Sequence, residues 1–490
     1  MIAFNEITAD VRAELQAVTF RTGLRNCNFT FANLVGWQPE FDTRYCILDG
    51  ALVLRHCFDG QMAYLINFDN RNKDSEKQNS LCAIHLVDKL REDAASRGED
   101  LLVMGLEDDR AQALHSCFPG ISTVTPKRSS YDYLYLREDL EHLAGKHLKA
   151  KRNHCNRFVE EHPDYEYCAI TPDLFDDCLA LADHWSEASE HENPSYGDSL
   201  SAEKRVLRRF FDNWQKLDMQ GGAIFIKEST DSSSVTDNKS HKRLVAFTLG
   251  APVTPDTFDI CIEKADRSVN GAFNIINQQF AKHLPEQYRY INREEDMGLV
   301  GLRKAKLSYH PHQLLSFNVL TISTTRLVRC TPSDSEESID WITRQYGFDR
   351  GEVSSWVRTL HFNWPMSVKA IDMEGRTVGL LNMSDYRVEE ETEQILNDKP
   401  ELVAALGRLR SIAVFSFIVA EKYRHTRLNY QMLMEIWSEL QSYDFIFVPV
   451  MHRLQTHHYW QRWGAREFYR DAQSVYYLIP LSEAAKRLQL

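Results

Sequence analysis

The sequence lacks any apolar run long enough to cross a bilayer, since none reaches the roughly 18 apolar residues that a spanning helix needs. Its start, MIAFNEITADVRAEL, contains acids and lacks a basic segment followed by an apolar core, which argues against a secretory signal peptide. We therefore expect a cytoplasmic protein without a transmembrane segment.

Cysteine motifs are also missing. The ten cysteines are scattered, with no CxxC pair and no Cys/His spacing of a zinc site. His310, His312 and the pair His457–His458 lack the carboxylate or cysteine neighbours that a metal would require at fixed offsets. We expect reduced thiols and no metal.

Positive charge is the scarcer sign, with 57 Lys and Arg against 70 Asp and Glu and a net charge of −13. This balance argues against a general nucleic-acid binder but permits a local basic groove. The 490 residues, 43% hydrophobic and 26% charged, are typical of a soluble globular protein with two to four domains.

The most informative stretch is residues 291–311, INREEDMGLVGLRKAKLSYHP, in which four charged residues are followed by two glycines and a basic cluster. Its leucines fall near helical spacing and predict a short helix over about residues 299–308. One interpretation is a surface helix whose charges suit its dipole. The other is a pocket wall at a strand end, with carboxylates for proton transfer and cations for an anionic donor.

One order of elements recurs three times along the chain: a strand, helices, antiparallel strands, then strand, helix, strand, helix and strand. An Asp-Gly turn at residues 49–50 and alternating apolar positions over residues 258–262 support the strand assignments. We expect three mixed α/β units over residues 1–140, 141–320 and 321–490, with closing strands at 131–136 and 312–320. The polar tract 229–241 predicts a flexible loop.

Four stretches together resemble the DUF2156 family, which is similar to the C-terminal catalytic domain of phosphatidylglycerol lysyltransferase. Besides residues 291–311 they are Phe29-Thr-Phe-Ala-Asn-Leu, Lys151-Arg-Asn-His-Cys-Asn-Arg-Phe and Asn270-Gly-Ala-Phe. The resemblance covers about residues 1–317. It implies tandem GNAT-like domains, each a mostly antiparallel sheet flanked by helices. It also implies transfer of an acyl or aminoacyl group from acyl-CoA or aminoacyl-tRNA to an amine or hydroxyl.

Such a reaction needs a base for the nucleophile and a proton donor for the leaving group. The candidate catalytic groups are three consecutive acids, one earlier acid and a tyrosine: Glu294, Glu295, Asp296, Glu263 and Tyr309. The acids are expected at neighbouring strand ends, and Tyr309 is the candidate acid. The alternative for Glu263 is an ion pair with Lys264 or Arg267, and for Tyr309 a purely packing role.

The donor is expected at Asn270, Gly271 and Ala272, because backbone N–H groups at a helix start bind phosphate and glycine permits close approach. Cations of the central stretch would face the donor phosphate or the tRNA acceptor end: Arg303, Lys304 and Lys306. A further basic helix and a strand-end amide are candidate substrate contacts: Lys149, Arg152, Asn153 and Asn292. The alternative for the basic helix is a solvated face. We expect no tightly bound cofactor and a small-molecule or lipid acceptor.

The third unit places Arg424, Arg427 and Asn429 where GNAT enzymes bind the pyrophosphate of acyl-CoA. The usual glycines are missing there, so we expect weak acyl-CoA binding. Three functions compete: a transferase acting from the second unit, an acetyl-CoA-dependent N-acetyltransferase acting from the third, and a non-catalytic binding protein. The sequence leaves the oligomeric state open.

Overall fold

The computed structural model describes residues 2–58, 60–68, 76–192, 197–227, 242–359, 362–385, 397–424, 426–452, 457–482 and 484. The predicted loop 229–241 lies outside these residues. The chain divides into two compact units, Met1–Arg91 with Leu101–Ile322, and Glu92–Asp100 with Ser323–Leu490. None of the described helices is both long and apolar enough to cross a membrane.

The first unit contains two seven-stranded sheets, of which the first has the order β1-β2-β3-β4-β5-β14-β6. Its strands are β1 (Asn5–Glu6), β2 (Arg44–Leu48), β3 (Ala51–Phe58), β4 (Gln61–Asn67), β5 (Leu101–Leu106), β6 (Ser122–Pro126) and β14 (Asn318–Ile322). The helices along this part of the chain are α1 (Arg12–Thr22), α2 (Phe31–Phe41), α3 (Glu76–Ser96) and α4 (Asp108–Cys117). The pair β4 and β5 is parallel, and the other neighbours are antiparallel.

The second sheet has the order β13-β7-β12-β11-β10-β9-β8. Its strands are β7 (Asp132–Leu136), β8 (Glu166–Ala169), β9 (Gln220–Lys227), β10 (Lys242–Thr254), β11 (Thr257–Ala265), β12 (Tyr290–Asn292) and β13 (Gln313–Leu315). Its helices are α5 (Arg137–His142), α6 (Lys149–Glu161), α7 (Phe175–Glu192), α8 (Gly197–Asp212), α9 (Ala272–His283) and α10 (Val300–Leu307). Only β11 and β12 pair in parallel among the described strands of this sheet.

The two sheets exchange their closing strands. Residues 131–136 were expected to close the first sheet, yet β7 pairs with β12 and β13 of the second. The expected strand 312–320 divides at residues 316–317 into β13, which stays in the second sheet, and β14, which pairs with β5 and β6 of the first. The alternation that marks a strand does not specify its partner, which is why the sequence assigned residues 131–136 and the part of 312–320 that forms β14 to the wrong sheet.

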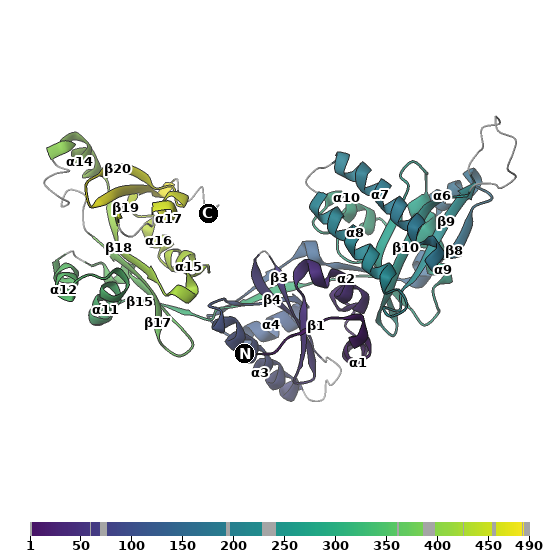
Figure 1. Ribbon diagram of the computed structural model, residues 1–490, viewed down its shortest axis with the longest axis horizontal. Coiled ribbons are helices and arrows are strands. Elements are labelled where there is room, and N and C mark those ends of the chain that lie inside the picture. The colour runs from purple at the N-terminus through teal and green to yellow at the C-terminus, as the bar shows by residue number, and fades with distance from the viewer. Residues whose placement is uncertain are drawn as a thin grey trace. The chain divides into compact units, whose positions relative to one another are not determined.

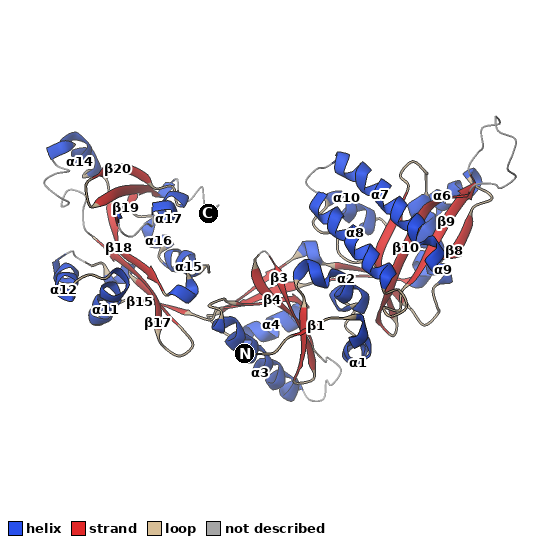
Figure 2. Ribbon diagram, in the orientation of Figure 1, coloured by secondary structure: helices blue, strands red, loops and turns tan. Residues whose placement is uncertain are grey.

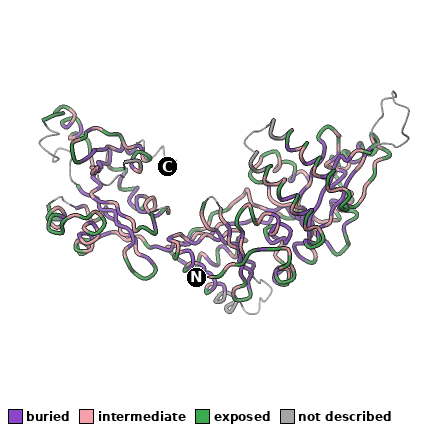
Figure 3. The backbone as a smooth tube through the Cα atoms, viewed as in Figure 1, coloured by how far each residue is buried: buried purple, intermediate pink, exposed green. Residues whose placement is uncertain are grey.

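One hydrophobic core joins the two sheets across residue 140. Leu15 and Phe31 from the first helices belong to the same buried cluster as Phe210 of α8 and Phe247 of β10. Helix α2 approaches α8 so closely that a side chain on Gly36 would meet the Phe210 ring. Figure 3 shows buried backbone along most strands of the sheets. The first unit therefore behaves as one packed body.

The second unit repeats the topology with the order β15-β16-β17-β18-β19-β21-β20 and β18 parallel to β19. Its strands are β15 (Arg326–Arg329), β16 (Val368–Ile371), β17 (Thr377–Ser384), β18 (Ser411–Val419), β19 (Phe445–Met451), β20 (Arg466–Arg470) and β21 (Ser474–Pro480). Its helices are α11 (Ser335–Tyr346), α12 (Arg350–Thr359), α14 (Pro400–Leu406), α15 (Leu428–Glu435), α16 (Trp437–Leu440) and α17 (His457–Arg462) (Figures 1 and 2). The threefold recurrence of mostly antiparallel sheets with helices confirms the predicted tandem GNAT-like fold.

Candidate functional site

The site is organised by the point where two parallel strands separate. Strands β11 and β12 pair only from Thr257 and Tyr290 to Asp259 and Asn292. Beyond that point β11 continues to Ala265, while the chain after β12 enters the predicted charged stretch and then α10. Helix α10 spans Val300–Leu307, as predicted to within one residue at each end. The separation leaves space at the strand ends for polar side chains.

Six side chains gather there and form what we term the acidic cluster: Cys27, Asp132, Asp259, Cys261, Glu294 and Glu295. The start of α2 supplies donors to it. Thr30 Oγ1 lies 2.6 Å from Asp259 Oδ2, and Asn33 Nδ2 donates to Asp259 Oδ2 at 3.1 Å and to Glu294 Oε1 at 2.8 Å. The cluster thus joins segments that are far apart in the sequence.

The other half of the cluster is built around Cys27 and Asp132. The Cys27 amide donates to Asp132 Oδ2 at 2.8 Å, and its Sγ lies 3.2 Å from Asp132 Oδ1 and 3.6 Å from Glu295 Oε2. Buried Asn292 connects the halves, since Nδ2 donates to Asp132 and Oδ1 accepts the Glu294 amide at 2.7 Å. Asn292, predicted to touch substrate, therefore holds the acids in place.

Acidic side chains outnumber basic ones in this cluster. Burial raises the pKa of Asp132 to about 6 and raises the pKa of Asp259 and Glu294 well above the ordinary range, with repulsion between the acids adding to the effect. Lys306 is the cation among them, and burial lowers its pKa. Within the described residues, Asp259 Oδ1 is buried and has no hydrogen-bond partner. The arrangement suits a positively charged ligand.

Two subsets of the cluster have the geometry to hold a metal ion. Cys27, Asp132 and Glu295 form one subset, and Asp259, Cys261 and Glu294 the other, each with ligand atoms within 4.8 Å of one another. Carboxylate and thiol groups are ligands that zinc accepts. A divalent ion and an organic ammonium group would both offset the same excess charge.

A second polar group lies beside the cluster. Glu263 accepts from Arg293 at 2.8 Å and from Asn277 at 3.3 Å, and the side chains of Glu263 and Arg293 are 11% and 12% exposed. Glu263 thus forms an ion pair, but with Arg293, and Lys264, one of the two partners expected from the sequence, pairs with Glu203 instead. Arg293 Nη1 is buried without a hydrogen-bond partner in the described part of the chain, so it retains a donor for a ligand.

Tyr309 completes this second group. Its hydroxyl accepts a hydrogen bond from Asn274 Nδ2 at 2.7 Å, and its ring lies 4.3 Å from the Lys151 ammonium and 4.9 Å from the Arg293 guanidinium. Burial raises the pKa of Tyr309, so the hydroxyl keeps its proton at neutral pH. The packing role and the role of proton donor are both compatible with this position.

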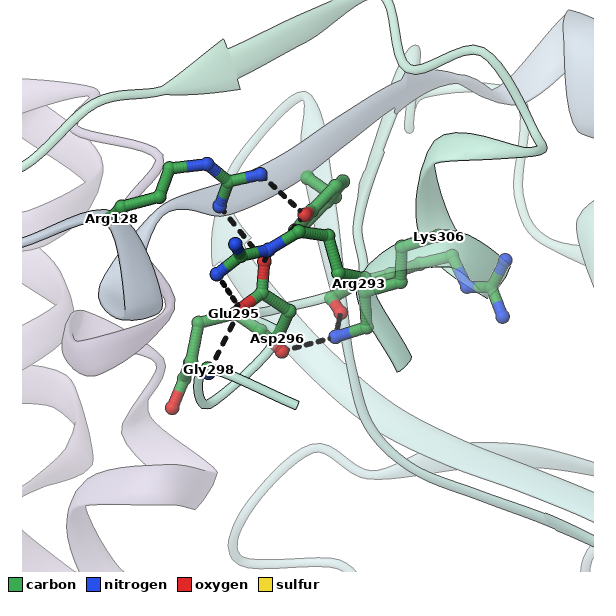
Figure 4. A network of polar contacts seen from close by, with 8 residues as sticks. Arg128, Arg293, Glu295, Asp296, Gly298 and Lys306 are labelled. Atoms are coloured by element: carbon green, nitrogen blue, oxygen red, sulfur yellow. Dashed lines mark hydrogen bonds and ion pairs between the residues drawn. The ribbon is translucent and has the colours of Figure 1, made fainter. Parts of the chain in front are cut away.

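Asp296 occupies a separate network. It is buried and accepts from Arg128, Arg303, Tyr133 and the Gly298 amide at 2.6–2.9 Å, and these partners together hold its pKa far below the ordinary value despite burial. A carboxylate with four such donors is a poor proton acceptor. Figure 4 shows Arg128 and Gly298 directed at Asp296. The position suits an anchor of the charged stretch rather than a base.

The predicted cations for a donor phosphate are largely committed elsewhere. Arg303 holds Asp296, and Lys306 donates to the main-chain carbonyls of Arg293 and Glu295 (Figure 4). Lys304 remains exposed on α10. Of these three, Lys304 is exposed without a partner among the described contacts, Arg303 is partly exposed but engaged by Asp296, and Lys306 is buried.

The glycine of the predicted donor loop has a packing role. Gly271 has φ of +81° at the start of α9, and a Cβ there would lie 2.7 Å from the His154 carbonyl oxygen of α6. The neighbouring Asn270 is exposed and Ala272 is buried. Valine at position 271 would therefore disturb the packing of α6 against α9, because α6 occupies the space that its side chain would need.

Comparison with known proteins places the chain in a family. The model of the family described as phosphatidylglycerol lysyltransferase, C-terminal, matches residues 21–319. The chain belongs to this family. A search of curated proteins found no match.

Among solved structures, a conserved protein of unknown function from Bacteroides thetaiotaomicron VPI-5482 is 35% identical with a TM-score of 0.57, covering 66% of this chain and all of that one. The DUF2156 domain of a putative lysylphosphatidylglycerol synthetase from Agrobacterium fabrum is 12% identical with a TM-score of 0.42, covering 64% of this chain and 92% of that one. The L-PGS from Bacillus licheniformis is 13% identical with a TM-score of 0.42, covering 71% and 100%.

The remaining predicted site residues of this family member lie outside both polar groups. On α6, Lys149 and Asn153 are exposed, and Arg152 donates to the carbonyl oxygens of Leu143 and Gly145. The basic helix therefore keeps exposed side chains that can contact substrate, but Arg152 also secures the preceding turn.

The three residues predicted in the third unit belong to the second compact unit. There Arg424 and Asn429 line a cavity of about 780 Å³, whereas Arg427 is exposed and lies outside its lining.

Several residues of the acidic cluster and its surroundings were not predicted from the sequence. Thr30 and Asn33 lie inside the motif Phe29-Thr-Phe-Ala-Asn-Leu, which served only as a mark of resemblance. Asp132 and Asp259 lie on strands β7 and β11, whose apolar residues led to a prediction of strand structure and not of a site. Asp132, which alternates with Leu134 and Leu136, carried a signal of burial, whereas Asp259 falls between the apolar positions of its strand and carried none.

Proposed function

We propose that the chain transfers an aminoacyl group from aminoacyl-tRNA to a hydroxyl or amine of a small-molecule or lipid acceptor. The acceptor oxygen or nitrogen attacks the ester carbonyl of the donor. A new ester or amide bond forms, and the bond from the carbonyl carbon to the ribose oxygen breaks. The proton lost by the acceptor passes to the leaving ribose oxygen, so no oxidant or reductant is required.

The excess of carboxylates in the acidic cluster carries this proposal. A buried charge is stable only when it is paired, and Lys306 alone does not balance four acids. An aminoacyl group brings its own ammonium, whereas the acyl group of acetyl-CoA brings none. Asp259 Oδ1, buried without a partner among the described residues, offers an acceptor for that ammonium. The site therefore favours an aminoacyl donor over an acyl one.

The neighbouring groups divide the remaining roles. We assign the acceptor's proton to Glu294, because a carboxylate with a raised pKa is a stronger base than an ordinary one. Arg293 Nη1 is assigned to the developing oxyanion. Glu263 positions Arg293, and Tyr309 gives a proton to the leaving oxygen.

A transfer assay tests the proposal. The full chain would be incubated with total tRNA charged with ¹⁴C-labelled amino acids, with phosphatidylglycerol vesicles or free amines as acceptors, and label leaving tRNA in a product other than the free amino acid would be measured. Glu294→Gln should lower the rate by about 10²-fold or more. Asp212→Asn, an exposed acid at the end of α8, should have no effect.

A second candidate function is distinguished from the first by measuring the release of free thiol from acetyl-CoA in the same preparation. The alternative is an acetyl-CoA-dependent N-acetyltransferase acting from the cavity of the second unit. Acetyl transfer without any aminoacyl transfer would replace the proposal by that function. Absence of both reactions across all acceptors would favour a non-catalytic binding protein.

A further inference from the structure

The second compact unit contains a cavity that the proposed function does not use. Strands β18 and β19 pair only from Ser411 and Phe445 to Ala413 and Phe447 and then separate. The cavity of about 780 Å³ is lined by Ala413 at the end of the paired segment and by the separated parts, residues 414–419 of β18 and 448–451 of β19. Its volume is in the range of sites that enclose most of a small organic ligand.

The wall of this cavity is mainly aromatic and aliphatic. Trp356 lies 5.0 Å from Phe348 and 6.4 Å from Phe415, and Phe417 lies 6.0 Å from Tyr459, measured between ring centroids. All five rings line the cavity. Such a wall binds an apolar body by removing its surface from water.

A single charge lies in this lining. Among the described lining residues, Arg424 is the only ionisable side chain with a charge at neutral pH, and no carboxylate accompanies it. Arg424 is exposed, and no ion pair of its guanidinium occurs in the described part of the chain. Because the charged residue is exposed while lining the cavity, it marks the solvent-facing end. A ligand with an apolar body and an anionic end matches both features.

The backbone beside Arg424 is not arranged for a pyrophosphate. At the start of α15 the Leu428 amide donates to Thr426 Oγ1 at 3.2 Å, and the Tyr430 amide donates to Asn429 Oδ1 at 3.0 Å. These N–H groups would be needed for a phosphate at a helix start. With them occupied by side chains, a nucleotide-bearing donor loses its main contact.

We propose that this cavity binds a single-chain amphiphile with an anionic head, such as a fatty-acid carboxylate. The chain lies between β18 and β19 against the aromatic wall, and the head group pairs with Arg424. This site is independent of the acidic cluster in the first unit, so either proposal can fail without the other.

Titration of the full-length protein tests the site, with tryptophan fluorescence as the signal because Trp356 and Trp460 line the cavity. Dodecanoate should bind saturably. Arg424→Gln should weaken dodecanoate about tenfold, the scale of one charge-assisted hydrogen bond, and leave dodecanol unchanged. Arg427→Gln is the matched control and should bind both as the unaltered protein does.

A second variant tests the position of the chain. Val450 is buried on β19 and lines the cavity, so Val450→Phe should weaken dodecanoate and dodecanol together. An affinity for dodecanoate that is the same in Arg424→Gln as in the unaltered protein would overturn the proposal, whether or not Val450→Phe folds. Dodecanoyl-CoA binding at least tenfold tighter than dodecanoate, with competition by free CoA, would also overturn it in favour of a nucleotide-bearing ligand.

Discussion

At the scale of single residues, ionisation of the acidic cluster works against folding. Asp132 has a pKa of about 6 in the fold against 3.8 in its absence. Between these values the native state binds more protons than the unfolded state, so stability falls as pH rises from about 4 to about 6 and stays lower above. For Asp132 alone the loss is on the order of 3 kcal/mol. Asp259 and Glu294, whose pKa values are also raised, extend the loss to higher pH.

Asp259→Asn should therefore stabilise the first unit while reducing transfer. An amide oxygen can still accept from Thr30 and Asn33, and one buried charge is removed. We expect a gain of about 1–3 kcal/mol at pH 8 that shrinks towards pH 4.5, followed as a shift in melting temperature. Asp212→Asn should change neither the stability of the first unit nor the rate of transfer. Equal destabilisation by Asp259→Asn at both pH values would contradict the assignment of a strained ionised cluster.

Arg303 and Lys304 give a second residue-scale prediction, because they are adjacent on α10 yet only Arg303 is engaged. Arg303→Gln removes a partner of buried Asp296 and should lower the melting temperature of the first unit. Lys304→Gln should stay within about 0.5 kcal/mol. Thermal melts of both variants decide the matter. If Lys304→Gln instead abolished donor binding while Arg303→Gln were silent, the basic cluster would be a phosphate contact as the sequence first indicated.

The charged stretch was recognisable from the sequence, but the directions of its side chains were not. Glu294 and Met297 both have positive φ, at 55° and 52°. Such backbone makes consecutive side chains diverge, so Glu294 joins the acidic cluster while Asp296 joins the arginines. Neither ordinary strand nor helix spacing predicts this. Strained backbone of this kind concentrates at functional sites.

At the scale of elements, the contact between α6 and α9 depends on Gly271. A side chain there meets the His154 carbonyl and the Phe158 Cβ, and the positive φ adds strain. Gly271→Ala should destabilise the first unit by about 1–3 kcal/mol. Gly301→Ala is the control, since Gly301 is helical and nothing lies within 4 Å of its added Cβ, and it should stabilise by about 0.5–1 kcal/mol. Melting temperatures of the two variants should move in opposite directions.

The exchanged strands give a prediction about fragments. Residues 1–140 lack β14, and residues 141–320 lack β7, so each fragment leaves an unpaired edge in the middle of a sheet. We expect neither to be soluble and folded alone, whereas residues 1–322 should show a cooperative melt. A folded, monomeric fragment 141–320 would mean that the two halves are independent domains, as the sequence predicted. The order of the elements could be predicted from the periodicity of apolar residues, but the pairing of the strands could not.

At the scale of the whole molecule, the chain carries two unlike sites in two compact units. The first unit holds an acidic site suited to a cation, and the second a largely apolar site with one cation. The element order of each unit could be predicted, because the pattern repeats. The contents of each site could not, because they depend on side chains from segments that no local pattern connects, such as Asn33 with Glu294.

The final prediction concerns the affinity of the chain for acetyl-CoA. Acetyl-CoA should bind the full chain with a dissociation constant above about 1 mM, which corresponds to less than about 4 kcal/mol of binding free energy. The reason is that the amides of Leu428 and Tyr430 already have side-chain acceptors, so a pyrophosphate would displace bonds rather than add them. Isothermal titration measures this directly.

Two variants complete the test. Arg424→Gln should leave aminoacyl transfer at its full rate, because Arg424 belongs to the second unit, while Asp259→Asn should leave dodecanoate binding unchanged. Micromolar binding of acetyl-CoA that is lost in Arg424→Gln would make the second unit an acyl-CoA site after all. Loss of aminoacyl transfer in Arg424→Gln would mean that the two sites work as one, since a merely local effect on the second unit cannot reach the acidic cluster without coupling between the units.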